Sequence, residues 1–305
     1  MAIDEILPIL CCPDCGADLA EKAGGLSCSS CESRFEVRDS VPLLYPRTMD
    51  RSHLREEEHL AETMRTWADS GENPFSQGQW HRSREEFWHL VRSVLKPPPG
   101  MVVNVGCGSD THFRELEEAG YRVVNFDLVV GWLNPVRGMT GAETYVAGDM
   151  MRLPFRKGSF DGVLSLDVIH HEYRAVPDLL RSFADLLKPG GTLVLADPNA
   201  WGFYQLPKSL LLPKPFYRFL RSAYHRFKGS SHRPADYEFP TSVGKTKKIL
   251  GGLGFSEIHV RENDAYPAIG PLRYRFYRLF AGSAFVRRYH NYHYMLWARK
   301  EGTPG

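Results

Sequence analysis

Two glycines directly after a run of β-branched residues constrain this chain more than any other feature. Residues 102–105 read Val-Val-Asn-Val, and Gly106 and Gly108 follow with one residue between them. The pattern predicts a buried strand, a tight turn and the start of a helix, a geometry that presents backbone N–H groups to a small-molecule cofactor. Two such glycines also fit an ordinary strand-to-helix turn, so the interpretation depends on the segments that follow.

The next segment indicates which kind of cofactor this turn would suit. A dinucleotide fingerprint requires a third glycine at position 111, where this chain has Thr111. A pyrophosphate cradle is therefore not indicated. Residues 121–127 read as a second strand that ends in Asp127, and a carboxylate at that point can accept hydrogen bonds from ribose hydroxyls. These features favour a nucleoside cofactor over a dinucleotide.

Further strands and turns follow in the order of an α/β fold. A third strand leads into Asp149, and a Pro-Gly-Gly sequence at 189–191 separates a predicted helix from the strand after it. The remaining predicted strands cover residues 160–166, 192–196, 255–260 and 293–299, with a helix at 245–253 before the last two. Asp127 would otherwise be a helix N-cap or a solvated loop acid, and Asp149 a turn residue.

With these features in this order, residues 101–200 resemble the class I S-adenosylmethionine-dependent methyltransferases, in the broad group that includes the ubiquinone-biosynthesis C-methyltransferases. The resemblance implies an α/β fold: a Rossmann-like, seven-stranded sheet with helices on both faces and an antiparallel last strand. It also implies that the turn underlies the methionine part of the cofactor, that Asp127 binds its ribose, and that Asp149 and the Met150 backbone lie beside its adenine.

The predicted cofactor-binding residues follow from this resemblance, and two of the family's usual positions differ. Asn104 stands where the family usually has an acid, and Ser109 replaces a frequent third glycine. We expect Cys107 to be a small buried loop residue and not a nucleophile. The full set is Asn104, Gly106, Cys107, Gly108, Asp127, Leu128, Asp149, Met150 and Leu166.

Four cysteines near the N-terminus have the spacing of a metal site. Cys12 and Cys15 form one CxxC pair, and Cys28 and Cys31 form a second. Two such pairs bring four thiolates within tetrahedral range of one ion, which predicts a closed, structural Zn²⁺ site. The alternatives are two disulfides or free thiols. Cys11 lies beside the cluster, and we interpret it as a non-ligand.

The resemblance at this end extends beyond the cysteines. Residues 35–44, which read Phe-Glu-Val-Arg-Asp-Ser-Val-Pro-Leu-Leu, resemble the strand after the second knuckle in the small zinc-ribbon activator subunits of tRNA and protein methyltransferases. In that family the ribbon pairs with the edge of the methyltransferase sheet. We therefore expect the ribbon of this chain to dock in cis on its own catalytic domain.

Length and charge divide the chain further. We predict a zinc ribbon at 1–46, a helical connector and cap at 47–99, and a methyltransferase domain at 100–305 with a basic, aromatic insertion at about 200–241. Residues 201–305 hold 18 Lys and Arg against 6 Asp and Glu, although the whole chain has a net charge of only +2. Within it, residues 206–221 read as a lid or amphipathic segment that suits a membrane surface, an isoprenoid-like tail or RNA phosphates, and equally as a packed helix with solvated lysines.

Two adjacent histidines are the predicted catalytic residues. His170 and His171 follow the fourth predicted strand, beside the expected methyl position, and either imidazole could act as a general base. Asp167 and Asp197 are the second candidates. Buried structural histidines are the alternative interpretation.

The resemblance therefore favours a methyltransferase. We expect it to be cytoplasmic, because zinc chemistry accounts for four of the six cysteines and suits a reducing compartment. We expect a small or lipid-linked acceptor, and a peripheral membrane contact is compatible with the basic segment. An RNA methyltransferase and a non-catalytic cofactor-binding scaffold are the alternatives.

Overall fold

The computed structural model describes residues 3–49, 54, 58, 79–108, 110–130, 144–202, 216, 219, 220, 223, 240–263, 279, 283 and 293–302. The strands in these residues are β1 (Leu19–Lys22), β2 (Gly25–Cys28), β3 (Arg34–Arg38), β4 (Val41–Leu44), β5 (Gly100–Val105), β6 (Tyr121–Asp127), β7 (Thr144–Gly148), β8 (Phe160–Leu166), β9 (Leu187–Pro198), β10 (Phe255–Asn263) and β11 (His293–Lys300). They form one continuous sheet in the order β1-β2-β3-β4-β7-β6-β5-β8-β9-β11-β10.

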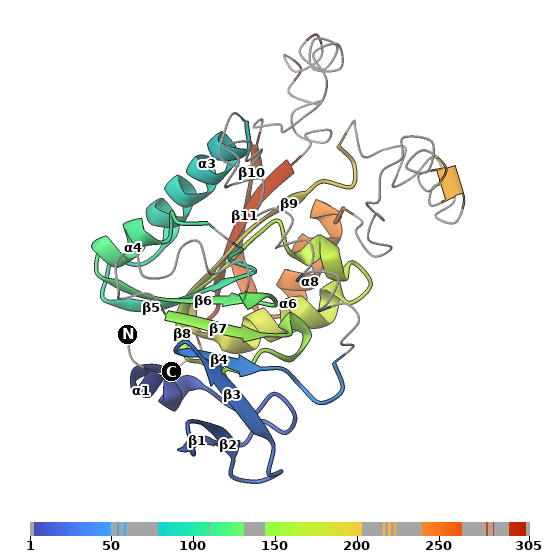
Figure 1. Cartoon of the computed structure of the whole chain (residues 1–305). Coiled ribbons are helices and arrows are strands. Elements are labelled where there is room, and N and C mark those ends of the chain that lie inside the picture. The colour runs from blue at the N-terminus through green and yellow to red at the C-terminus, as the bar shows by residue number, and fades with distance from the viewer. Residues whose placement is uncertain are drawn as a thin grey trace, which may run out of the picture.

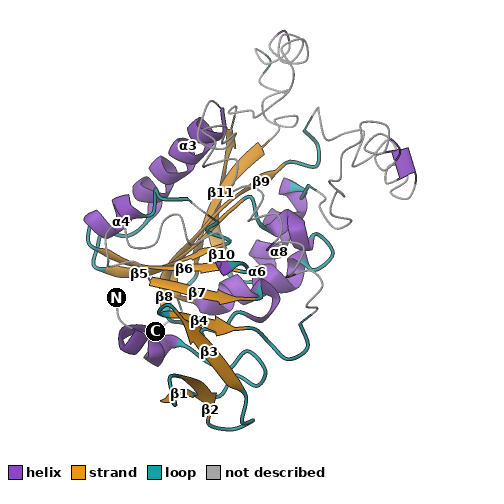
Figure 2. Ribbon diagram, in the orientation of Figure 1, coloured by secondary structure: helices purple, strands orange, loops and turns teal. Residues whose placement is uncertain are grey.

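Seven neighbouring strands, in the spatial order β7-β6-β5-β8-β9-β11-β10, form the central part of this sheet (Figure 2). β7, β6, β5, β8 and β9 are parallel, and β11 runs antiparallel to both β9 and β10. The predicted seven-stranded sheet with an antiparallel last strand is confirmed. The chain proceeds outward from β5 through β6 to β7 and then crosses back to β8, so the strand order reverses between β5 and β8. Open α/β sheets bind ligands at the carboxyl ends of the strands at such a reversal.

Helices cover both faces of this central sheet, as Figure 1 shows. On one side lie α3 (Gln79–Val94) and α4 (Arg114–Glu118), and on the other α6 (Val176–Leu186) and α8 (Val243–Gly252). Three short 3₁₀ helices, η1 (Leu7–Ile9), η2 (Met150–Arg152) and η3 (Ile169–Glu172), and the first helix α1 (Ile3–Ile6) complete the described elements.

Alternate residues of the buried strands divide between two hydrophobic cores, because successive side chains of a strand point to opposite faces. Val102 of β5 packs in the core under α3 and α4, whereas Val103 packs in the core under α6 and α8. Phe87, Leu90 and Val91 of α3 are buried in the first of these cores.

The N-terminal segment, residues 3–49, extends the central sheet at its β7 edge. β4 pairs in parallel with β7, with Leu43 opposite Ala147 and Leu44 opposite Gly148. A second contact lies nearby, where the Cys11 N–H donates to the Pro154 carbonyl at 2.9 Å. The N-terminal segment and the central sheet also share one hydrophobic core. The structure thus has the cis docking that the sequence predicted.

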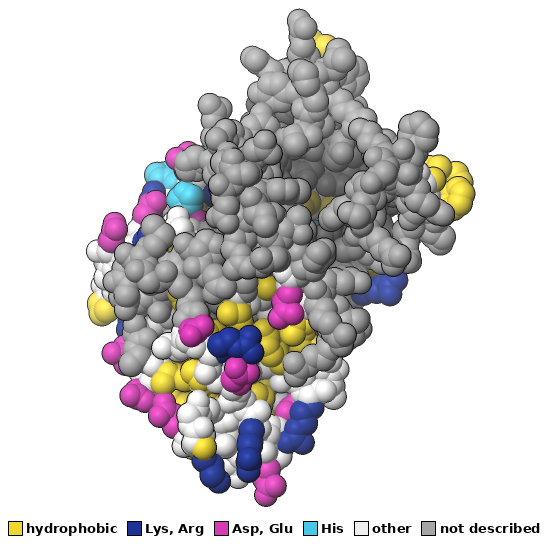
Figure 3. All heavy atoms as spheres, in the orientation of Figure 1, with side chains coloured by type: hydrophobic (Ala, Val, Ile, Leu, Met, Phe, Trp, Pro, Cys, Tyr) yellow, Lys and Arg dark blue, Asp and Glu magenta, His cyan; other side chains and the backbone are white. Residues whose placement is uncertain are grey.

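Several predictions fall on residues that the structure does not describe. Ser109 lies outside the described residues. Most of residues 50–78 of the predicted connector and most of the basic insertion at 200–241 lie outside them too. In the described part of the chain, no helix has the length and apolar composition that crossing a bilayer requires. On the face drawn in Figure 3, acidic and basic side chains of the described residues are interspersed.

Candidate active site and metal centre

The glycine turn at the carboxyl end of β5 is held by the end of β6. Gly106 and Gly108 have φ angles of +70° and +53°, a backbone conformation that residues other than glycine rarely adopt. The N–H groups of Gly106 and Cys107 donate to the Phe126 carbonyl at 2.8 and 3.1 Å. A Cβ atom on Gly106 would lie 2.2 Å from Cγ2 of Val168, whereas one on Gly108 would meet nothing within 4 Å. The turn is therefore packed below Gly106 and open at Gly108, as a cradle for a ligand requires.

Asp127 ends β6 and closes this turn from the opposite side. One carboxylate oxygen accepts the Gly108 N–H at 2.8 Å, and the other accepts the Val129 N–H at 3.0 Å. Burial raises the pKa of Asp127 above its ordinary value, although these backbone N–H groups oppose the rise. Each oxygen of an ionised carboxylate has a second acceptor position, so the predicted hydrogen bonds to ribose hydroxyls remain compatible with this geometry.

Asn104 lies one strand position from the turn and faces a second buried amide. Its Nδ2 donates to Oδ1 of Asn125 at 3.2 Å, and the two residues are directly opposite each other in β5 and β6. A carboxylate at position 104 would accept from Asn125 instead. The neutral amide of Asn104 thus avoids a buried charge beside the turn.

The remaining predicted cofactor residues line the same edge of the sheet. Asp149 follows β7 and caps η2 by accepting the Met151 N–H at 2.8 Å. Leu128 follows Asp127, Met150 begins η2, and Leu166 ends β8; all three are partly exposed. Cys107 is buried, which raises the pKa of its thiol well above the ordinary value. This agrees with the expectation that Cys107 is not a nucleophile.

An acid that sequence reasoning missed ties the turn to helix α3. Asp110 accepts from the indole Nε1 of Trp88 at 2.9 Å and from the His112 backbone at 3.0 Å, and Arg84 of α3 lies 4.0 Å away. Burial by itself raises the pKa of Asp110, but the hydrogen bonds from His112 and the charge of Arg84 outweigh it and lower the pKa overall. The signal available in the sequence was an acid two residues after the second glycine.

The structure separates the two predicted catalytic histidines by their partners. Nδ1 of His170 lies 2.9 Å from Oδ1 of Asp197, which is fully buried at the end of β9. The other oxygen of Asp197 accepts from the Thr241 hydroxyl at 2.7 Å, and Thr241 contacts the Tyr294 hydroxyl. The ring of His171 lies against that of His170, with centroids 4.3 Å apart. A buried carboxylate therefore orients His170.

Replacing Gly106 with alanine tests the turn. The left-handed conformation costs a residue with a side chain about 1–2 kcal/mol, and the new methyl group would clash with Val168. We expect at least a tenfold loss of affinity for S-adenosylhomocysteine by calorimetry, together with a lower melting temperature. Gly244→Ala in helix α8 is the matched control, because its Cβ meets nothing within 4 Å. Equal affinity in the Gly106 variant and wild type would contradict the predicted role of the turn.

The four predicted zinc ligands converge in the N-terminal segment. The Sγ atoms of Cys12, Cys15, Cys28 and Cys31 all lie within 4.8 Å of one another, and the closest pairs are 3.4 and 3.6 Å apart. A tetrahedral ion with zinc–sulfur bonds of about 2.3 Å requires sulfur atoms about 3.8 Å apart. The thiol donors and their spacing therefore fit Zn²⁺.

Neighbouring polar groups support this cluster. Backbone N–H groups of Ser30 and Cys31 donate to the Cys28 sulfur at 3.4 Å. A hydrogen bond with the Ser33 hydroxyl lowers the pKa of Cys31 to about 6. The Ser33 hydroxyl lies 3.1 Å from the Cys31 sulfur and 2.8 Å from a carboxylate oxygen of Asp14, and Asp14 accepts the Arg47 N–H at 2.8 Å. These contacts favour thiolates and link the cluster to the segment that follows β4.

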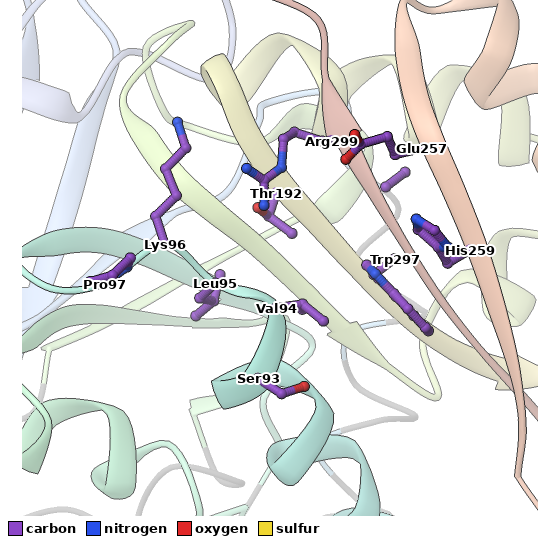
Figure 4. Close-up of a pocket in the computed structure, with 11 residues that line it drawn as sticks. Ser93, Val94, Leu95, Lys96, Pro97, Thr192, Glu257, His259, Trp297 and Arg299 are labelled. Carbon is purple, nitrogen blue, oxygen red and sulfur yellow. The ribbon is translucent and has the colours of Figure 1, made fainter.

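A groove of about 340 Å³ lies elsewhere, at the opposite end of the sheet (Figure 4). It is bounded by the end of α3, the start of β9 and the end of β11, with Trp297 stacked on His259. These strand ends are the amino edge of the parallel sheet, so the groove is separate from the glycine turn and the His170–Asp197 pair.

Comparisons with known proteins agree with this arrangement. Residues 103–195 match the family model of a methyltransferase domain. A stretch of 126 residues, 40% of this chain, is 32% identical to demethylmenaquinone methyltransferase of Renibacterium salmoninarum. The chain spans 50% of the length of that curated relative.

Two solved structures show the same fold at low sequence identity. A phosphoethanolamine N-methyltransferase 2 of Haemonchus contortus in complex with S-adenosyl-L-methionine superposes with a TM-score of 0.54 and 16% identity, over 93% of this chain and 71% of that one. A chain from a Haloferax volcanii complex that contains the Trm112 methyltransferase activator gives a TM-score of 0.52 and 16% identity, over 81% of this chain and 96% of that one.

Proposed function

We propose that this protein, whose residues 103–195 match the family model of a methyltransferase domain, transfers a methyl group from S-adenosylmethionine to a small or lipid-linked acceptor. The observation that carries the proposal is that a glycine turn and an oriented histidine follow the two neighbouring strands, β5 and β8, between which the strand order reverses. The open glycine turn faces Asp127, and the oriented His170 lies at the end of the neighbouring strand β8.

The residues of the carboxyl edge fit this co-substrate. The turn, open at Gly108, would lie under its methionine part; Asp127 would face its ribose, and Asp149 with Met150 its adenine. The sulfonium group supplies a methyl carbon that is already activated. The chain then has to align the acceptor with that carbon and exclude water.

His170 is the general base in this proposal. If Nδ1–H donates to the buried Asp197, then Nε2 is the nitrogen that accepts a proton from the acceptor. Asp197 also stabilises the imidazolium that forms, as a buried acid does in other catalytic pairs. A base is needed only where the acceptor atom carries a proton near neutral pH, so the pair favours a hydroxyl or another protic group.

Two observations support a small or lipid-linked acceptor. One curated relative, which matches 40% of this chain, is named for demethylmenaquinone, a lipid-linked quinone. Large apolar side chains, including Trp201 and Phe219, are exposed near the carboxyl edge and in the basic insertion. RNA is the second candidate, because residues 201–305 carry 18 basic and 6 acidic residues.

One experiment tests the proposal and separates its alternatives. The zinc-loaded protein is titrated with S-adenosylhomocysteine and then incubated with methyl-tritiated S-adenosylmethionine and the small-molecule, lipid and RNA fractions of a cell extract. We expect binding, and label in the small-molecule or lipid fraction. Label in RNA, with binding that falls steeply as salt rises, would favour the RNA alternative. Binding without transfer to any fraction would favour the non-catalytic scaffold.

A further inference from the structure

A second acid at the carboxyl edge has an unusual backbone conformation. Asp167 directly follows β8 and has a φ angle of +59°. Its backbone N–H donates to the Ala196 carbonyl at 2.8 Å, so the strained residue remains paired with β9. A side chain in the left-handed region persists only where the surroundings hold it, and such residues gather at functional sites.

A buried histidine from the far end of the chain holds this carboxylate. His293 begins β11 and is 3% exposed, and its Nε2 is hydrogen-bonded to Oδ1 of Asp167. The two residues are 126 positions apart in the chain. They meet because β11 is antiparallel to β9, which places the first residue of β11 opposite Pro198 at the carboxyl edge.

The charges around Asp167 keep it ionised. Burial raises its pKa, but the opposite charge and hydrogen bond of His293 on β11, followed by His170 on η3 and Arg84 on α3, lower it overall. Oδ1 is used by His293, whereas Oδ2 has no hydrogen-bond partner among the residues that the structure describes. The side chain is 25% exposed, so one oxygen of an ionised carboxylate is available at this edge.

We propose that Asp167 binds the methyl acceptor through this second oxygen and that His293 is its positioning residue. The inference rests on the proposed function and deepens it, since it defines the class of acceptor. The acceptor has two hydrogen-bond donors, one that faces His170 and loses its proton, and a second, such as a neighbouring hydroxyl, that donates to Asp167. If the Asp167–His293 pair only joined β8 to β11, it would require neither the strained conformation of Asp167 nor an Oδ2 atom without a hydrogen-bond partner among the described residues.

Relief of the backbone strain separates the two interpretations. In Asp167→Gly the left-handed conformation is no longer strained, which offsets the loss of the hydrogen bond to the buried His293, so we expect a melting temperature close to that of wild type. We expect methyl transfer to fall by about 10- to 100-fold, the usual cost of a lost hydrogen bond to a charged group, with S-adenosylhomocysteine affinity within about threefold. Glu257→Gly is the matched control, because Glu257 has a φ of +51° and lies on the exposed edge strand β10. It should retain full transfer.

Substitution of His293 tests the positioning role. Gln supplies an N–H that can reach Asp167, whereas Phe keeps the volume of the buried ring without a donor. We expect His293→Gln to retain more methyl transfer than His293→Phe. In both variants the loss should appear mainly as a raised KM for the acceptor in the labelled fraction. A packing role predicts the reverse order, since an apolar ring fills a buried position better than an amide does.

For each variant, transfer of the tritiated methyl group is measured to the extract fraction that the wild-type protein labels. Binding of S-adenosylhomocysteine to the same variants is measured by calorimetry. Methyl transfer by Asp167→Gly at the wild-type rate would overturn the inference. Loss of S-adenosylhomocysteine binding in that variant would also overturn it, because the carboxylate would then bind the co-substrate. Wild-type protein that binds but labels no fraction would overturn the proposed function and, with it, this inference.

Discussion

Cys28→Ser is expected to lose close to one equivalent of zinc and to unfold the N-terminal segment. A structural zinc site contributes its binding free energy directly to folding. Residues 3–49 are too few to supply a sufficient apolar core without the metal. Because β4 pairs with β7, the loss should also reach the central sheet. We expect the melting temperature of the whole protein to fall by about 10 °C or more, since each 1 kcal/mol corresponds to about 2–4 °C for a domain of 150–250 residues.

The same variant should bind S-adenosylhomocysteine more weakly. The hydroxyl of Tyr45, directly after β4, donates to the Leu128 carbonyl at 2.7 Å. Leu128 follows Asp127, so the N-terminal segment supports the loop that is predicted to bind the ribose. Cys11→Ala is the matched control: Cys11 is buried beside the cluster but is outside the group of four sulfurs. Zinc content and melting temperature unchanged in Cys28→Ser would contradict the structural role of the metal.

His170→Gln is expected to lower kcat for methyl transfer by about 10²–10⁴-fold, the usual contribution of a general base. Its affinity for S-adenosylhomocysteine should remain within about threefold, because the proposed function places His170 toward the acceptor. Asp197→Asn should lose activity for a related reason, since an amide neither fixes the imidazole tautomer nor stabilises its cation.

His171→Gln provides the comparison within the tandem pair. The two oxygens of Asp197 contact His170 and Thr241, whereas the ring of His171 lies beside that of His170. We expect this variant to keep transfer within about fivefold of wild type. The opposite result, with transfer abolished in His171→Gln and preserved in His170→Gln, would move the base to His171. Preservation in both variants would indicate an acceptor that needs no base.

Most of the fold could be predicted from the sequence because its signals are local. The alternation of apolar residues in buried strands, the helix-to-strand order and the Gly106–Gly108 turn each depend on neighbours within about ten positions. The largest difference in a boundary concerns the strand predicted at 192–196, which is β9, Leu187–Pro198, and begins before the Pro-Gly-Gly sequence. Pairing of Phe160 with Leu187 in β8 and β9 draws that segment into the sheet, and no local propensity reports such a partner.

The candidate site was only partly predictable for the same reason. His170 was recognised from its place after a strand, but its partner Asp197 is 27 positions away, and Thr241 is 44 positions beyond Asp197. His293 looked like the first residue of an ordinary strand. Its meeting with Asp167 depends on the direction of β11, which the residues around position 293 do not encode locally.

The sequence by itself determined the cluster of four cysteines, the glycine turn and the class of sheet, because spacing along the chain governs each of them. Only the tertiary structure decided which carboxylate each histidine meets and which strand β4 extends. Those contacts join residues far apart in the chain at the carboxyl edge of a single sheet, and their geometry exists only after the strands have paired.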